Sequence, residues 1–167
     1  MNMRANRLPI AATAIILALT ATLPAPVLAY TQTTTYNVTS TVTATCLISG
    51  SSLGFGSYSG SSINAQTTVS VQCTNGTTYN IGLNAGTASG ASVSTRAMTG
   101  PGGATLSYAM YQDTNHTTNW GNTVGTDTVG GTGNGNSQSI SVYGQLPASQ
   151  FVTPGSYSDT ITATVTY

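Results

Sequence analysis

Hydrophobic and polar side chains alternate with a period of two in several short stretches of this chain. The first stretch covers residues 36–44 and the last covers residues 157–167, and both alternate apolar side chains mainly with small polar ones such as Thr and Ser. Such alternation is typical of half-buried β-strands. The chain contains no Lys, although natural sheets commonly protect exposed edges with charged residues. The pattern therefore predicts terminal strands that are able to pair with a further chain.

Two further alternating stretches lie close together in the first half of the chain. Residues 68–73 and residues 77–84 each place three large side chains on one face, and these are Val69, Val71 and Cys73, and Tyr79, Ile81 and Leu83. Asn75 and Gly76 lie between the stretches and favour a type I′ turn, which needs positive φ at both positions. We therefore predict a β-hairpin here. Earlier in the chain, Gly54 and Gly56 permit a bulge or a close backbone approach.

More strands are predicted in the second half. The glycine-rich residues 85–103 are expected to form loops around a short extended segment at residues 96–98, and residues 112–136 are expected to form a polar loop. The strands on either side of the polar loop carry Leu106, Tyr108 and Met110, and Ile140, Val142 and Leu146. No window shows the spacing of an amphipathic helix. We expect an all-β chain of about six to eight short strands, which is typical of a β-sandwich.

The first 29 residues have the layout of a secretory signal peptide. Arg4 and Arg7 give a positive start, residues 8–23 are mostly apolar, and residues 27–29 form a small-residue cleavage site. A membrane anchor is the alternative, but Thr residues and flanking prolines interrupt the apolar stretch. We expect export with cleavage before Tyr30 and no stable membrane insertion of the rest.

The expected mature chain, residues 30–167, carries few charges. Its ionised side chains at neutral pH are Arg96, Asp113, Asp127 and Asp159. The lack of a basic patch argues against binding to nucleic acid or to anionic membranes. Low charge also favours association, which is harmful for a free monomer and useful in a polymer.

Cys46 and Cys73 are the two cysteines of the chain. An even number of cysteines in an exported chain favours a disulfide. A redox pair or a metal site is the alternative, but the CxxC spacing and additional ligands are missing. We expect a structural disulfide, which the chain-entropy model values at about 3 to 4 kcal/mol.

Candidate catalytic residues are sparse. The three aspartates have no spacing that demands convergence, so we interpret them as solvated carboxylates rather than as a glycosidase pair. His116 lies among polar neighbours, which predicts exposure, and it has no second His or Cys to complete a metal shell. A Ser-His-Asp triad is formally possible, but no GxSxG motif accompanies the histidine. We expect no enzymatic activity, no metal and no cofactor.

Two further features allow a functional and a structural interpretation. Tyr108, Tyr111 and Trp120 could stack against a sugar, but packing in the core or on the sheet surface is the favoured interpretation. The glycine-rich residues 131–135 precede no helical pattern and lack a Lys. We therefore interpret them as a flexible loop rather than as a phosphate-binding loop.

Seven short motifs follow one another along the mature chain. They are Cys46, LGFG at residues 53–56, VQC at 71–73, RAM at 96–98, LSYAMY at 106–111, WG at 120–121 and PGSYSDT at 154–160. This ordered set resembles the spore coat protein U domain, a family that includes subunits of archaic chaperone–usher pili. The resemblance covers almost the whole mature chain.

The resemblance implies an incomplete immunoglobulin-like β-sandwich over residues 46–167, with a hydrophobic groove where its last strand is missing. In that family a periplasmic chaperone lends a strand, and at an outer-membrane usher the N-terminal extension of the next subunit replaces it. Such strand addition takes its affinity from main-chain hydrogen bonds and its specificity from alternate side chains.

The resemblance also assigns roles to the two terminal stretches. Residues 30–45 are the expected donor-strand extension, with donor positions at Tyr36, Val38, Ser40 and Val42. Ser40 departs from the usual apolar choice, which leaves open a shallow pocket or a register shifted by two residues. The groove border and chaperone contact are expected at Tyr157, Ile161, Ala163, Val165 and Tyr167.

We therefore expect a structural subunit of a surface pilus, which forms a head-to-tail homopolymer by donor-strand exchange. One alternative is an exported binding module or adhesin that completes its own sandwich by folding residues 36–44 back. Another is a coat or matrix component that uses the same linkage. In each case the chain is exported through the periplasm to the cell surface or beyond.

Overall fold

The computed structural model describes residues 26–167, and the chain divides into two units at residues 1–39 and 40–167. Residues 26–39, the described part of the first unit, contain no helix or strand. Almost all of the expected signal peptide lies outside the described residues, so export stays a prediction. Among the described residues, no helix has the length and apolar character needed to cross a membrane.

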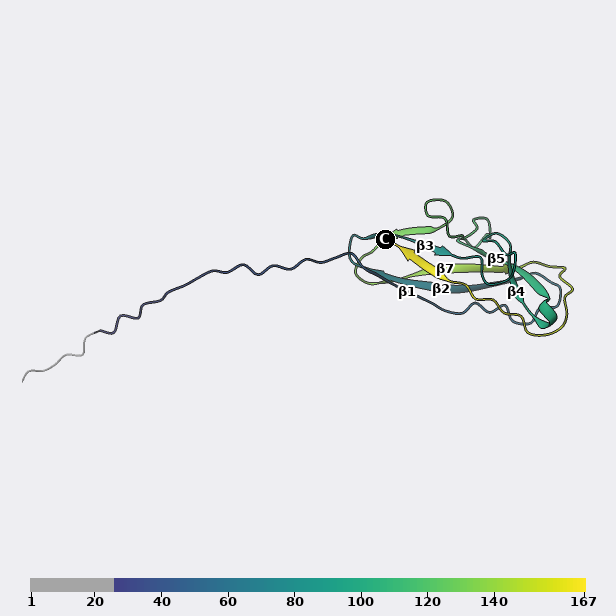
Figure 1. Cartoon of the computed structure of the whole chain (residues 1–167), viewed down its shortest axis with the longest axis horizontal. Helices are drawn as coiled ribbons and strands as arrows, with labels where there is room; N and C mark the ends of the chain where they lie inside the picture. Colours follow the sequence, from purple (N-terminus) through teal and green to yellow (C-terminus); the bar gives the residue numbers. More distant parts are fainter. Residues whose placement is uncertain (1–25) are drawn as a thin grey trace, which may run out of the picture. The chain divides into compact units, whose positions relative to one another are not determined.

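The second unit is an antiparallel sandwich of two sheets (Figure 1). The larger sheet has the order β1-β2-β7-β5-β4 and the smaller sheet the order β6-β3-β8. The strands are β1 (Cys46–Gly50), β2 (Ile63–Cys73), β3 (Thr78–Leu83), β4 (Arg96–Thr99), β5 (Thr105–Tyr111), β6 (Val129–Thr132), β7 (Ser137–Leu146) and β8 (Ala163–Thr166). A 3₁₀ turn covers Pro101–Gly103, and the described residues contain no α-helix. The expected all-β fold is confirmed.

The core lies between the two sheets and contains the faces that alternation predicts. Every large inward side chain of β2 near its end, of β3 and of β5 is buried, and these are Val69, Val71, Cys73, Tyr79, Ile81, Leu83, Leu106, Tyr108 and Met110. Trp120 joins them from a loop, is fully buried, and donates its indole N–H to the carbonyl of Ile81 over 2.8 Å. Tyr108 and Trp120 therefore pack in the core rather than forming a sugar platform.

The predicted hairpin between β2 and β3 is wrong, because the two strands belong to different sheets. Both edges of β2 are already paired, with β1 and with β7. The chain instead crosses from one sheet to the other through a turn in which Thr77 N–H donates to the carbonyl of Thr74. Only Gly76 has positive φ in this turn, at 82°, so the turn is not type I′.

Four other expectations about local structure need correction. The expected polar loop 112–136 contains a strand, β6, where Gly131 pairs with Tyr79 so closely that a Cβ atom would lie 2.5 Å from the tyrosine oxygen. This close packing replaces the expected flexible loop. The last ladder begins only at Ala163, and residues 36–44 form no strand. A strand needs a partner, and residues 36–44 have none among the described residues.

Candidate functional site: a groove between the sheets

Two strand edges remain unpaired on one side of the sandwich. β1 ends the order of the larger sheet and pairs only with β2, while β8 ends the order of the smaller sheet and pairs only with β3. The two edge strands are neighbours across the sandwich (Figure 1). A groove of about 690 Å³ lies beside them and reaches the core, where its apolar lining includes Ile48, Val69, Leu83, Met110, Val142 and Ile161.

The C-terminal segment forms one wall of this groove. Residues 157 to 165 alternate between half-buried and exposed positions, although the ladder starts only at Ala163. Tyr157, Ile161 and Ala163 line the groove, Val165 packs against the core, and Tyr167 is 58% exposed. Ahead of the ladder, the segment is held by two backbone hydrogen bonds between Thr99 and Ser158. The outer edge of β8 is left without a partner among the described residues.

A second hollow of about 840 Å³ continues the groove toward residues 150–157. The two hollows share Leu53, Phe55, Met98 and Tyr157 in their linings. Leu53 and Phe55 reach this position from the segment after β1, which is in no strand.

Gly144 on β7 makes room for these two side chains. A Cβ atom at Gly144 would lie 2.5 Å from Leu53 Cδ2 and 3.0 Å from Phe55 Cζ. Of the bulge and the close backbone approach that Gly54 and Gly56 permit, the close approach does not occur, since a Cβ atom at either would meet nothing within 4 Å.

Arg96 is a fully buried cation beside the core. Its guanidinium donates four hydrogen bonds of 2.7 to 2.9 Å to the backbone carbonyls of Leu83, Asn84, Val93 and Trp120. Burial lowers the pKa of Arg96, while nearby acidic groups oppose this effect. All of the donors point into the protein, so the side chain fixes loops rather than offering an anion-binding site.

Asp159 lies in the groove wall and is half-buried, so its interpretation as a solvated carboxylate is wrong. One carboxylate oxygen accepts a 2.7 Å hydrogen bond from the Tyr108 hydroxyl, and the other accepts bonds from the N–H and hydroxyl of Thr87. Burial alone would raise the pKa of Asp159, but these hydrogen bonds lower it. Burial and the bond to Asp159 together raise the pKa of Tyr108.

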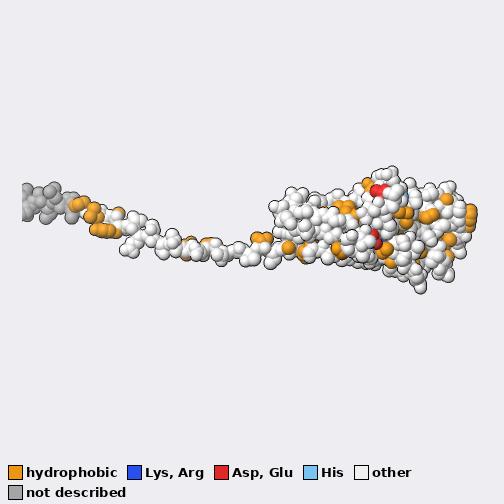
Figure 2. Space-filling model, turned by 90° about the horizontal axis from the view of Figure 1, so that it is seen from above, with side chains coloured by type: hydrophobic (Ala, Val, Ile, Leu, Met, Phe, Trp, Pro, Cys, Tyr) orange, Lys and Arg blue, Asp and Glu red, His pale blue; other side chains and the backbone are white. Residues whose placement is uncertain are grey.

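The other carboxylates hold their own loops. Asp113 accepts backbone hydrogen bonds from Thr117 and Thr118, which lower its pKa to about 2. Asp127 accepts a bond from Thr123 N–H four residues earlier. No group of three metal-ligating side chains occurs within residues 26–167. Figure 2 shows that, on the face drawn, the surface of the 40–167 unit is almost free of charged side chains.

His116 is half-buried rather than exposed as its neighbours predict. Its ring lies edge-on to the ring of Tyr111, with 5.2 Å between centroids and an interplanar angle of 84°. The aromatic contact accounts for the burial that the polar neighbours of His116 did not indicate.

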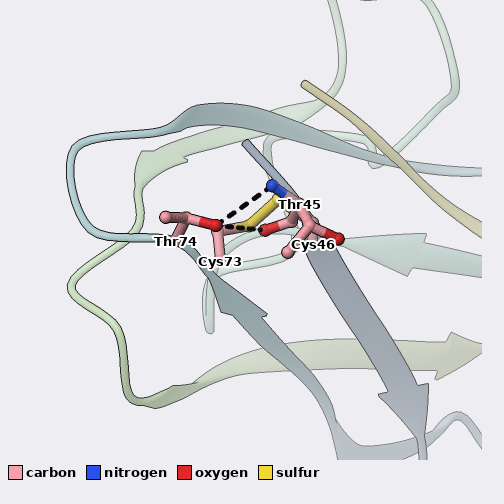
Figure 3. Close-up of a disulfide and its surroundings, with 4 residues drawn as sticks. All are labelled: Thr45, Cys46, Cys73 and Thr74. Carbon is pink, nitrogen blue, oxygen red and sulfur yellow. Dashed lines mark hydrogen bonds between the residues drawn. A yellow bond between two sulfur atoms is a disulfide. The ribbon is translucent and has the colours of Figure 1, made fainter. Parts of the chain in front are cut away.

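The predicted disulfide joins Cys46 to Cys73 (Figure 3). The two cysteines are also directly paired in the β1–β2 ladder. Next to them, Thr45 N–H donates to the Thr74 hydroxyl and Thr74 N–H donates to the Thr45 carbonyl, each over 3.0 Å. The first residue of β1 is therefore fixed to β2 at the point where the N-terminal residues leave the sandwich.

The four expected donor residues are all exposed. Tyr36, Val38 and Val42 expose 83%, 85% and 81% of their surface, and Ser40 is exposed as well. None of them is in a strand. Large apolar side chains at such exposure are available to a partner.

Comparison with known proteins identifies the family of this chain. The family model of the Spore Coat Protein U domain matches residues 32–164. The chain belongs to the spore coat protein U domain family. Protein U of Myxococcus xanthus is 42% identical over 62 residues, which are 37% of this chain and 34% of that protein. The chain thus spans about a third of the length of this curated relative.

The fold of this spore coat U domain also has a solved counterpart. It is similar to a chain in the crystal structure of the CsuC–CsuE chaperone–tip adhesion subunit pre-assembly complex from archaic chaperone–usher Csu pili of Acinetobacter baumannii. The TM-score is 0.59 at 21% identity, and the match covers 76% of this chain and 41% of that chain. The expected family and the immunoglobulin-like sandwich class are confirmed.

Sequence reasoning missed two residues that shape this spore coat U domain. The sequence presents Arg96 as part of a motif and as a charge, although a lone Arg between two apolar strands is a signal for a buried hydrogen-bonding role. Gly144 was not singled out at all. A glycine in the middle of an alternating strand is a signal for close approach by another segment, and Leu53 and Phe55 make that approach here.

Proposed function

We propose that this chain is a structural subunit of a surface pilus and that residues 36–44 of one copy fill the groove of the next. The observation that carries the proposal is the groove between the unpaired edges of β1 and β8, in a chain whose own alternating extension is exposed and unpaired. An added strand would pair with β8 and cover the core. Burial of Tyr36, Val38 and Val42 would contribute about 1.5 to 3 kcal/mol each.

All strand pairs of the described sheets are antiparallel, which favours an added strand antiparallel to β8. Thr166 of β8 pairs with Asn80, near the start of β3. The start of β3 follows shortly after Cys73, which is bonded to Cys46. The end of β8 therefore lies at the Cys46 end of the sandwich. A donor antiparallel to β8 therefore ends near residues 150–157, at the opposite end. Each copy then attaches its Cys46 end to the far end of its neighbour, and such a heterologous contact extends into a filament.

The partners of this chain follow from the same groove. A free groove leaves apolar side chains such as Ile48, Met98 and Ile161 partly exposed, which supports a periplasmic chaperone as the first occupant and an outer-membrane usher as the place of exchange. The solved counterpart is a chaperone–subunit pre-assembly complex, which supports the same order. The product is a homopolymer on the cell surface with a structural rather than an enzymatic role. The family description favours a second candidate, a coat component with the same linkage.

Removal of residues 30–45 tests the proposal. The truncated chain keeps the groove and the disulfide but has no donor, so it should bind the extension of an intact copy and form no polymer by itself. The measurement is gel laddering and size exclusion of exported protein, alone and mixed with the intact chain. The matched control replaces Asn37 and Thr39 by Ala, because these alternate positions face away from the groove. Long polymers from the truncated chain would contradict the proposal.

A further inference from the structure

Leu53 and Phe55 lie where the two hollows of the groove meet, and we call this place the narrow point because the two side chains fill part of it. These two side chains belong to the linings of both hollows, together with Met98 and Tyr157. The first hollow lies toward Ala163 and the second toward residues 150–156. A strand that runs the length of the groove must pass this point.

Packing holds Leu53 and Phe55 at the narrow point. Phe55 lies against Tyr108 with ring centroids 6.1 Å apart and tilted by 59°. Leu53 and Phe55 both fill the space above Gly144, and both are half-buried. A bulky donor side chain could enter here only if this cluster moved, and overpacking of this kind is destabilising.

We propose that Ser40 of one copy lies opposite Leu53 and Phe55 of the next copy and that its small side chain sets the register of the donor strand. This inference rests on the proposed function. Donor positions two residues apart are separated by about 7 Å along a strand. With the donor antiparallel to β8, Tyr36 and Val38 enter the first hollow and Val42 enters the second. A shift by two residues in either direction brings Val38 or Val42 against Phe55.

Ser40 is the one small side chain among the four inward donor positions. The small polar side chain of Ser40 therefore suits the place where Leu53 and Phe55 of the acceptor already fill part of the groove. Of the two explanations for Ser40, a shallow pocket or a register shifted by two residues, this inference selects the shallow pocket. Ser40 acts as a specificity-determining residue, because a donor with a large side chain at this position is rejected.

The test uses the exported full chain, in which a Ser40 change alters only the donor and a Phe55 change alters only the acceptor. Ser40→Leu should speed polymer dissociation by about tenfold or more, because it overpacks the narrow point. Phe55→Ala should remove most of that defect in the double variant. The control Thr39→Leu, on the outward side of the donor, should leave dissociation unchanged. Leu53→Ala is the second acceptor variant if Phe55→Ala loses its circular dichroism signal.

The outcomes separate this inference from the proposed function. If Ser40→Leu polymers are as stable as those of the unchanged chain, or if the double variant shows the summed defects of both changes, the register is wrong. Val38→Ser and Val42→Ser should still weaken the polymer in that case. If none of the donor variants alters association, donor-strand exchange itself is contradicted.

Discussion

The hydroxyl group of Tyr108 donates a 2.7 Å hydrogen bond to Asp159 and thereby ties the segment before β8 to the larger sheet at the groove. Tyr108 belongs to β5 of the larger sheet, and Asp159 precedes β8 of the smaller sheet. Both residues line the groove. The bond holds the C-terminal segment against the larger sheet in the region where it has no continuous ladder partner, so it keeps one wall of the groove in place.

Replacement of Tyr108 by Phe should therefore lower the free energy of unfolding. The change removes one charge-assisted hydrogen bond from a partly exposed carboxylate and keeps the ring in the core, so the expected loss is about 1 to 2 kcal/mol. Urea unfolding followed by Trp120 fluorescence measures it. Tyr157→Phe is the matched control, because Tyr157 donates only to the carbonyl of Thr153 in an exposed contact. Equal stability of the two variants would contradict this role of Asp159.

The lowered pKa of Asp159 predicts a loss of stability in acid. A carboxyl whose pKa is lower in the folded chain stabilises the fold above its unfolded pKa of about 3.9, and this contribution is lost as the pH falls through the folded value. Unfolding should thus become easier below about pH 4, and Asp159→Asn should make this dependence less steep. Urea titrations across that range measure the effect.

Asp113 must be separated from Asp159 in these titrations. Its pKa is also lowered, to about 2, by hydrogen bonds within its own loop. Asp113→Asn therefore reports the share of the acid dependence that comes from a residue outside the groove. An unchanged pH slope in Asp159→Asn, with a flattened slope in Asp113→Asn, would assign the whole effect to the loop.

The buried faces of this fold could be predicted from sequence because alternation is a local property. Side chains two residues apart on a strand share a face whatever the strand pairs with. Val71 and Ile81 are both fully buried, as their patterns predict. The pairing of β2 with β7, at Val69 and Ile140, joins residues far apart in the sequence. The Asn75–Gly76 signal is equally compatible with a turn between two sheets, and for this reason the hairpin prediction failed.

The candidate site could be predicted in part. The alternation after Tyr157 indicates which residues face inward, and the structure places Tyr157, Ile161 and Ala163 in the groove wall. The narrow point could not be predicted, because it depends on contacts between Gly144 and a segment about 90 residues earlier that has left the ladder. A local sequence pattern does not indicate which distant segment of the chain packs against Gly144.

Arg96 should be one of the least replaceable residues of the domain. Arg96→Lys retains the charge but cannot serve four carbonyls at once, so buried acceptors lose their donors. The expected loss is about 3 kcal/mol or more, measured by urea unfolding. Arg96→Met removes the four hydrogen bonds together with the cost of burying a charge. Comparison of Arg96→Met with Arg96→Lys therefore separates the loss of the hydrogen bonds from the cost of the buried charge. A stability of Arg96→Lys within error of the unchanged chain would show that the four bonds contribute little.

Gly144 should be required for the segment after β1 to enter the groove. Gly144→Ala places a Cβ atom against Leu53 and Phe55, so the two side chains must move outward or the sheets must separate. The expected loss is about 1 to 3 kcal/mol in the free energy of unfolding. Gly54→Ala is the matched control, because a Cβ atom there meets nothing within 4 Å and its backbone is not left-handed. The near-ultraviolet circular dichroism spectrum, to which Tyr108 and Phe55 contribute, should change only in Gly144→Ala. If both variants unfold at the same urea concentration, the packing above Gly144 does not hold the narrow point of the groove.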